Sequence, residues 1–167
     1  MADARKKVVV RSLEGEVSWC YLPQSGFAAN GRVEALDISG RAITFDLSEL
    51  KTVAYVKDFN LDDSVDPERI GRRSFLGRPR GDGIWLKVEF RDGETLEGLV
   101  HFDGSFLDGL MEDRGFRMVP PDARSNTQMI FVPRAALAGV EVLGYVAAPG
   151  KKKVKAASVA QPRLFED

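Results

Sequence analysis

The segment WLKVEFRDGETLEGLVHF, residues 85–102, indicates the fold class. Apolar and polar residues alternate through Trp85–Arg91, which predicts a strand with one buried face. Asp92-Gly93 is typical of a tight hairpin turn, and Thr95–Phe102 is the expected return strand. The sequence therefore predicts antiparallel β-structure here.

The same pattern of short strands and glycine-containing turns runs through the rest of the chain. Lys7–Leu13 is a predicted strand, Glu14-Gly15 its turn and Val17–Leu22 the return strand. The other strands that we expect are Gly31–Asp37, Arg41–Leu47, Thr52–Val56, Gly115–Val119, Gln128–Pro133 and Gly139–Leu143. Long helical periodicity is nearly absent, so the sequence predicts a mainly β protein.

The two groups of strands resemble each other. Each opens on an apolar strand and an acidic-Gly-Glu turn, which are Glu14-Gly15-Glu16 and Asp92-Gly93-Glu94. Each closes with the same apolar spacing, in which Phe45, Leu50, Val53 and Val56 correspond to Val132, Leu137, Val140 and Leu143. A single helical turn is expected before each last strand, at Ser48-Glu49-Leu50 and Arg134–Leu137. These matches predict a tandem repeat; the alternative is one irregular β domain whose hairpins look alike by chance.

The predicted repeat divides the chain into four parts. Residues 6–58 are the first unit, 59–83 a charged linker loop, 84–146 the second unit and 147–167 a disordered basic tail. A unit of about 50 residues with five short strands can bury a core only by bending its sheet strongly. We therefore expect two small tandem five-stranded β-barrels with short helical turns, which would protect each other's open edges.

Composition excludes several kinds of site. Cys20 is the only cysteine and His101 the only histidine, so no internal disulfide, thiolate zinc site or two-histidine metal site can form. A Ser-His-Asp triad would have to use His101. The sequence therefore favours a non-enzymatic protein without metal or cofactor. We expect it in the cytoplasm and off the membrane, because no signal sequence is found and no apolar run reaches roughly 18 residues.

Charge is distributed unevenly along the chain. The net charge is -1, but residues 144–167 carry five basic and two acidic side chains, so the remaining residues carry -4. The linker begins acidic and then contains five arginines: Arg69, Arg72, Arg73, Arg78 and Arg80. Two interpretations stay open. The linker is either a solvated connector whose halves neutralise each other, or an arginine loop that binds phosphate or nucleic acid.

Several short stretches carry a family resemblance. These stretches resemble an uncharacterised bacterial family of tandem small β-barrels. They are residues 53–59, 87–94, 115–116, 120–122, 125–126 and 130–137. That family is distantly similar to Sm-like proteins, including the RNA chaperone Hfq. The resemblance spans roughly residues 6–145 and implies Sm-like barrels and, by fold analogy, RNA binding. The glycine-rich RNA-binding signature of Sm proteins is not found in this sequence, and their ring assembly would here need a ring of doublets.

A shorter motif resembles a different class of binding protein. Asp37-Ile38-Ser39-Gly40, together with Arg69 and Arg72-Arg73, is similar to the motifs with which PilZ domains bind cyclic di-GMP, in reversed order and with altered spacing. This resemblance implies a cyclic-dinucleotide sensor that uses the arginine loop. The alternative is that Ser39-Gly40 is an ordinary hairpin turn.

The tail carries the sharpest motif. It is rich in Ala, Pro, Gly and Lys, which is typical of a disordered linker. Its end, with Gln161, Leu164 and Phe165, resembles the peptide by which bacterial polymerases and repair proteins dock on the DNA sliding clamp. Four preceding lysines could contact DNA phosphates: Lys151, Lys152, Lys153 and Lys155. We therefore expect an adaptor whose tail docks on a protein partner; RNA binding and nucleotide sensing are the alternatives, and the oligomeric state stays open.

Overall fold

A computed structural model describes residues 5–23, 28–112 and 114–147. The N-terminal half contains β1 (Lys6–Ser12), β2 (Val17–Leu22), β3 (Ala28–Ala29), β4 (Arg32–Asp37), β5 (Ala42–Asp46), the 3-10 helix η1 (Leu47–Glu49) and β6 (Leu50–Val56). The C-terminal half contains β7 (Gly83–Phe90), β8 (Thr95–Val100), α1 (Gly104–Met111), β9 (Gly115–Met118), β10 (Thr127–Pro133), the 3-10 helix η2 (Arg134–Ala136) and β11 (Leu137–Val146). The predicted mainly β class is confirmed.

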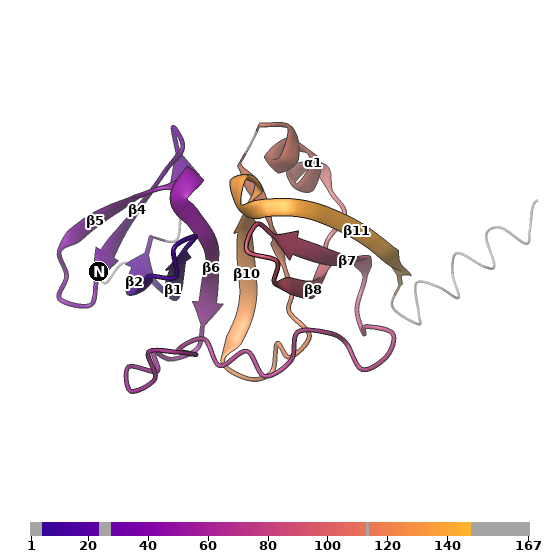
Figure 1. Ribbon diagram of the computed structural model, residues 1–167, viewed down its shortest axis with the longest axis horizontal. Coiled ribbons are helices and arrows are strands. Elements are labelled where there is room, and N and C mark those ends of the chain that lie inside the picture. Colours follow the sequence, from indigo (N-terminus) through magenta and orange to yellow (C-terminus); the bar gives the residue numbers. More distant parts are fainter. Residues whose placement is uncertain (1–4, 24–27, 113, 148–167) are drawn as a thin grey trace, which may run out of the picture.

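The strands form two sheets (Figure 1). The larger sheet has the order β3-β4-β2-β1-β6-β10-β9, with β5 paired to β4, and the smaller has the order β11-β7-β8. Val53 on β6 lies opposite Phe131 on β10, so the larger sheet runs through both halves. Within the described residues neither sheet closes on itself, so the closed tandem barrels that we expected are not confirmed.

The two halves make equivalent strand pairings. In each half, the first strand lies between the second and the last strand, and a later hairpin pairs with the second strand. Matched pairs from the two halves are Val10–Ser18 with Val88–Leu96, Val10–Val53 with Val88–Val140, Val33–Phe45 with Phe116–Val132, and Tyr21–Leu36 with Leu99–Val119. The first-to-last ladder contains a register shift at the same place in both halves, between Arg11 and Ser12 and between Leu137 and Gly139.

The predicted acidic-Gly-Glu turns occupy equivalent places. Gly15 donates its N–H to the Ser12 carbonyl at 3.0 Å, and Gly93 donates to the Phe90 carbonyl at 2.9 Å. Both glycines have positive φ angles, 95° and 89°, a region that glycine enters without steric cost. The helical turns that the sequence predicts before the last strands are η1 and η2. The local sequence similarity therefore corresponds to the same backbone geometry.

Two apolar clusters lie on opposite faces of the shared sheet. Val8 and Val10 belong to one cluster and Val9 to the other, because successive residues of a strand point to opposite faces. The first cluster includes Phe131 from the C-terminal half, and the second includes Ala54 from the N-terminal half. Each core is therefore built from both halves, which explains why β6 and β10 stay paired.

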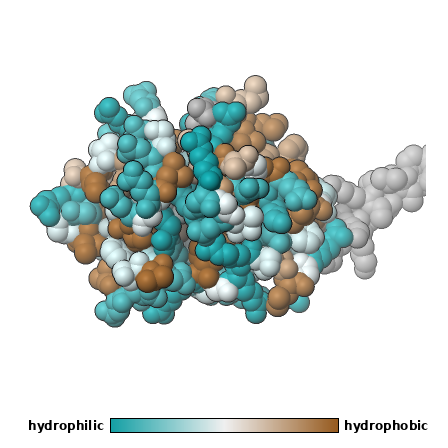
Figure 2. Space-filling model, viewed as in Figure 1, coloured by the Kyte–Doolittle hydropathy of each residue, from teal (hydrophilic) through white to brown (hydrophobic). Residues whose placement is uncertain are grey.

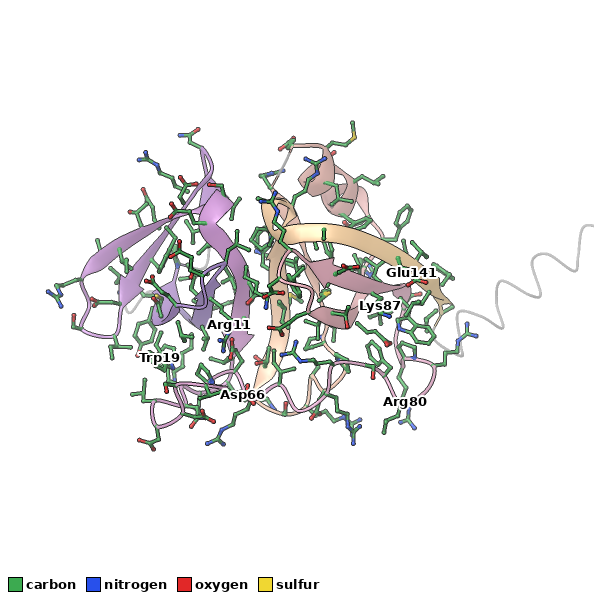
Figure 3. The ribbon with its side chains drawn as sticks, viewed as in Figure 1. Arg11, Trp19, Asp66, Arg80, Lys87 and Glu141 are labelled. Carbon is green, nitrogen blue, oxygen red and sulfur yellow. The ribbon has the colours of Figure 1, made fainter. Side chains whose placement is uncertain are left out.

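The charged segment between the halves is irregular, as expected, but its middle is anchored. Glu68 is 2% exposed and forms an ion pair with Arg11 on β1. Its carbonyl accepts a hydrogen bond of 2.6 Å from Thr127 Oγ1 on β10. Figure 3 shows Arg11 close to the part of this segment that contains Asp66. The interpretation of residues 59–83 as a solvated connector is therefore wrong around Glu68.

Ser125-Asn126, part of the stretches that carry the family resemblance, also holds this segment. Asn126 Oδ1 accepts from the Asp58 N–H at 3.0 Å, and Asn126 Nδ2 donates to the Asp58 carbonyl at 2.9 Å. Ser125 Oγ lies 3.4 Å from the Arg69 carbonyl, to which it donates. These contacts fix the chain just after β6 to the loop before β10, so the motif has a structural role.

Helix α1 replaces the end of a predicted strand. The sequence predicts a strand to Phe102, but β8 ends at Val100 and α1 follows. Phe106 donates its N–H to the carbonyl and to Oδ1 of Asp103, at 3.2 and 3.3 Å, which begins the helix. Gly109 packs so close to the Gly115 carbonyl that a Cβ would collide with it. A helix of eight residues is too short to show a clear helical periodicity of apolar residues, so the sequence pattern did not predict it.

Candidate functional site

A pocket of about 460 Å³ lies where β6 pairs with β10. The described residues that line it are Arg5, Lys6, Lys7, Tyr55, Val56, Lys57, Arg117, Gln128 and Met129. Five of these side chains are cationic, and no carboxylate occurs among the described lining residues. We call it the basic pocket. Its charge favours an anionic ligand.

Strand pairing brings these residues together from distant parts of the sequence. Tyr55 on β6 lies opposite Val8 on β1 and opposite Met129 on β10. The register of β10 shifts between Thr127 and Met129, which leaves Gln128 outside the regular ladder and beside the pocket. Such irregularities redirect side chains at binding sites. The pocket therefore depends on the pairing of the two halves.

Tyr55 is the centre of the basic pocket. Lys6 Nζ lies 5.8 Å from the centroid of its ring, and Arg117 Cζ lies 5.7 Å from the same centroid. Contacts of this kind hold a cation over an aromatic face with about 0.5–1 kcal/mol at exposed sites. Burial raises the pKa of the Tyr55 hydroxyl, and the positive charge of Arg117 partly opposes that shift. The phenol is therefore neutral near pH 7, and the site keeps its positive charge.

Two of the cations have partners outside the pocket. Lys7 Nζ lies 3.0 Å from Asp58 Oδ1, and the Asp58 side chain is 83% exposed. Lys57 Nζ donates to the Arg124 carbonyl at 2.9 Å. An exposed ion pair is weak and gives way easily to a competing anion. The pocket therefore presents cations that are positioned but still open to solvent.

The predicted arginine loop is spread out in space. Arg69 Nη2 donates to Asn60 Oδ1 at 2.9 Å, Arg73 Nη1 lies 2.8 Å from Glu94 Oε2, and Arg78 Nη2 donates to the Tyr145 carbonyl at 3.1 Å. Arg72 and Arg80 are exposed, and Figure 3 places Arg80 on the loop that leads into β7. None of these five arginines is among the described residues that line the basic pocket.

The predicted tail site lies outside the described residues. This holds for all its members: Lys151, Lys152, Lys153, Lys155, Gln161, Leu164 and Phe165. Of the other residues that the sequence analysis singled out, Cys20 is fully buried, and burial raises the pKa of its thiol to about 11. His101 is exposed just beyond β8. Among the described residues, no three His, Cys, Asp or Glu side chains group closely enough to hold a metal ion.

The basic pocket was missed by sequence reasoning. Lys6-Lys7 at the start of one predicted strand and Lys57 at the end of another are only a weak signal of positive charge. Arg117 and Met129 join them only because β10 pairs with β6, and nothing in the local sequence predicts that pairing between the halves. Long-range pairing of this kind is what pattern reasoning on one sequence detects least well.

Comparisons with known proteins identify a family but no activity. The model of a family described as "Family of unknown function (DUF6982)" matches residues 4–144. No curated protein and no solved structure matches. Of the helices in the described part of the chain, none is long and apolar enough to cross a membrane.

Proposed function

The chain belongs to this family of unknown function, DUF6982, and we propose that it is a non-enzymatic binding module whose basic pocket holds the phosphate backbone of single-stranded nucleic acid. The observation that carries the proposal is the lining of the pocket, with five cations around one tyrosine and no carboxylate among its described residues. Lysine and arginine are the usual phosphate contacts, and an aromatic ring among them is typical of single-strand binding.

The distribution of charge favours a single strand over a duplex. Residues 1–143 carry a net charge of -4, so the body of the protein does not present a broadly basic surface. A duplex is normally bound by a broad basic surface, whereas a flexible strand can follow a short groove. The pocket of about 460 Å³ fits a short piece of a flexible strand better than a rigid double helix.

Direct binding measurements test this function. A fluorescein-labelled 15-nucleotide RNA, the matching single-stranded DNA and the matching duplex are titrated with the full chain, and anisotropy is followed at several salt concentrations. We expect both single strands to bind more tightly than the duplex, with an affinity that falls as salt rises. If neither the single-stranded RNA nor the single-stranded DNA binds at low salt, the proposal is excluded.

The relation to Sm-like small barrels remains part of this proposal. It is supported by the equivalent pairings of the two halves, which a duplicated five-stranded unit would produce. The 3-10 helices η1 and η2, each placed directly before a last strand, support the same duplication. The cyclic-dinucleotide alternative is weaker, because Arg69, Arg73 and Arg78 each contact a different partner.

A second candidate function rests on the tail sequence. Gln161, Leu164 and Phe165 form a pattern that resembles a clamp-docking peptide, and lysines precede it. An extended peptide of this kind offers one amide for hydrogen bonds and two adjacent apolar side chains for a hydrophobic cleft. A labelled peptide of residues 151–167 should bind purified bacterial sliding clamp, and Leu164→Ala with Phe165→Ala should abolish that binding. Equal binding by the two peptides would remove this candidate.

A further inference from the structure

A second pocket, also of about 460 Å³, opens between β8 and β9. In the described residues the only backbone pairing between these two segments is the bridge between Leu99 and Val119. The N-terminal half closes the equivalent space more fully, because β2 pairs with β4 and β3 adds to β4. In the C-terminal half α1 stands over this opening instead (Figure 1). The pocket is therefore a consequence of replacing a short strand with a helix.

Aromatic side chains form a row at this pocket, which we call the aromatic pocket. The rings of Phe106 and Phe116 make an edge contact with centroids 5.2 Å apart, and both residues line it. The ring of Phe102 lies 6.4 Å from that of Phe106. Exposure falls along the row, from 54% at Phe102 to 3% at Phe116. The row therefore leads from solvent toward the core.

Exposed apolar side chains also lie on and beside α1, the helix that contributes Phe106 and Gly109 to this pocket. Figure 2 shows hydrophobic residues on the surface of both halves, including the half that carries α1 and β11. Phe102, Leu107 and Met111 are large apolar residues on or beside α1 that are 54%, 47% and 85% exposed. Grouped apolar exposure of this kind marks a binding surface more often than isolated residues do.

The two pockets are adjacent. Arg117 and Met129 line both of them. Arg117 also contacts the ring of Tyr55 in the basic pocket. His101 and Asp103 add polar groups to the lining of the aromatic pocket. A ligand that spans both pockets would meet cations on one side of Arg117 and aromatic rings with a few hydrogen-bonding groups on the other.

We propose that the aromatic pocket receives one unstacked base of a single-stranded nucleic acid whose phosphates lie in the basic pocket; this inference rests on the proposed function. A base has two apolar faces and a polar edge, which matches aromatic walls with His101 and Asp103 beside them. The phosphate of the same nucleotide then lies beside Arg117. An apolar peptide side chain would use the aromatic walls but not the adjacent cations.

The test compares a normal strand with a strand that has no bases. A labelled 15-nucleotide DNA and an abasic strand of the same length carry equal charge, so phosphate contacts are the same for both. We expect the full chain to bind the base-containing strand about 10-fold more tightly or better, because stacking one base contributes a factor of about 5 to 150. A matching RNA shows whether the sugar affects the pocket.

Two variants test whether the preference for the base-containing strand arises in the aromatic pocket. Phe106→Leu, which removes an aromatic ring from the lining and keeps an apolar side chain, should remove most of the difference between the normal and abasic strands and leave abasic binding unchanged. Ile38→Ala, at a 54% exposed apolar residue that is outside the lining of the aromatic pocket, should leave the difference intact. Equal affinity of wild type for both strands would overturn the base pocket while the phosphate site stands. Failure of both strands to bind would overturn the proposed function as well.

Discussion

Arg11 on β1 and Glu68 in the segment between the halves form a two-pronged ion pair. Arg11 Nε lies 2.8 Å from Glu68 Oε1, and Arg11 Nη2 lies 2.7 Å from Glu68 Oε2. The hydrogen bond to Glu68 raises the pKa of the Arg11 guanidinium further. The Arg11 side chain is 23% exposed and that of Glu68 3% exposed, so the pair is largely removed from water. It ties the connecting segment to the shared sheet.

Breaking this pair should destabilise the fold. We expect Glu68→Gln to lower the free energy of unfolding by about 2–4 kcal/mol, because it leaves a largely buried guanidinium without its countercharge. Urea denaturation followed by circular dichroism measures the change. Glu112→Gln, which removes an exposed ion pair with Arg114, is the matched control and should cost less than about 1 kcal/mol. Equal losses in the two variants would show that Arg11–Glu68 is no anchor.

The core positions at which the equivalent halves differ include two that are in contact in the C-terminal half. Cys20 and Gly98 occupy matching places on β2 and β8, and Ala35 and Met118 occupy matching places on β4 and β9. A Cβ on Gly98 would collide with the sulfur of Met118. The C-terminal half therefore combines a very small residue, Gly98, with a large one, Met118. At the same two positions the N-terminal half has Cys20 and Ala35, which differ less in size.

This complementarity predicts strong coupling between Gly98 and Met118. Gly98→Cys should destabilise by about 1–3 kcal/mol through overpacking, and Met118→Ala by about 2–5 kcal/mol through the cavity that it leaves. The double variant copies the arrangement of the N-terminal half and should be more stable than the sum of the single losses by about 0.5–3 kcal/mol. Additive losses in urea denaturation would contradict the equivalence.

Local patterns in the sequence were enough to predict most strands. The hairpins around Gly15 and Gly93 and the 3-10 helices lie where alternation and turn residues place them, because those features depend on nearby residues. The pairing of β6 with β10 was not predictable, because both strands are apolar and either could have closed its own unit. Helix α1 was missed because it depends on the fit of Gly109 against Gly115.

The candidate site was harder to predict than the fold. The cluster of arginines at Arg72-Arg73 predicts an anion site in the connecting segment. A pocket, however, is formed by residues that are close in space, and these need not be close in the sequence. Lys6, Tyr55 and Arg117 come together through two strand pairings that join distant segments. The arginines of the connecting segment instead form separate contacts along its path.

The basic pocket and the arginine loop can be separated by mutation. Lys6→Ala with Arg117→Ala should weaken single-strand binding about 10-fold or more, because charge-assisted contacts contribute roughly 1.5–3 kcal/mol each. The slope of log affinity against log salt should become shallower by about one to two units. Arg72→Ala with Arg80→Ala removes the same charge and should change binding little. The reverse result, measured by anisotropy, would move the site to the arginine loop.

The buried thiol of Cys20 predicts a loss of stability at high pH. Burial raises its pKa to about 11, above the ordinary value of 9.0, so the unfolded chain loses this proton at a lower pH than the folded chain. The contribution is fully present below about pH 9 and is lost as pH rises to about 11, with a total of about 2–3 kcal/mol.

The Cys20→Ala variant isolates this effect from other titrations. Tyrosines and lysines also titrate in this range, so the informative quantity is the difference in unfolding free energy between wild type and Cys20→Ala. That difference should shrink between pH 9 and pH 11 by about 2–3 kcal/mol. A difference that stays constant with pH would mean that the thiol is not shielded from water.

Lys87 and Glu141 occupy the positions in the C-terminal half that Val9 and Ala54 occupy in the N-terminal half. Val9 and Ala54 are 0% and 1% exposed, because the C-terminal half covers them. Lys87 and Glu141 are exposed, and Figure 3 shows them on the neighbouring strands β7 and β11. β11 has β7 as its only strand neighbour in the described residues, so it is an edge strand. Charges beside an edge discourage pairing with another chain.

Replacing these two charges should therefore cause self-association. Lys87→Val with Glu141→Ala would replace this cross-strand pair of charges with apolar side chains beside an open edge, and sedimentation velocity should show larger species as concentration rises. Wild type should keep one sedimentation coefficient over the same range. Glu112→Ala with Arg114→Val removes an exposed ion pair away from β11 and should behave as wild type. Association of wild type to the same extent would show that these charges do not protect the edge, since β11 would then already be paired between chains.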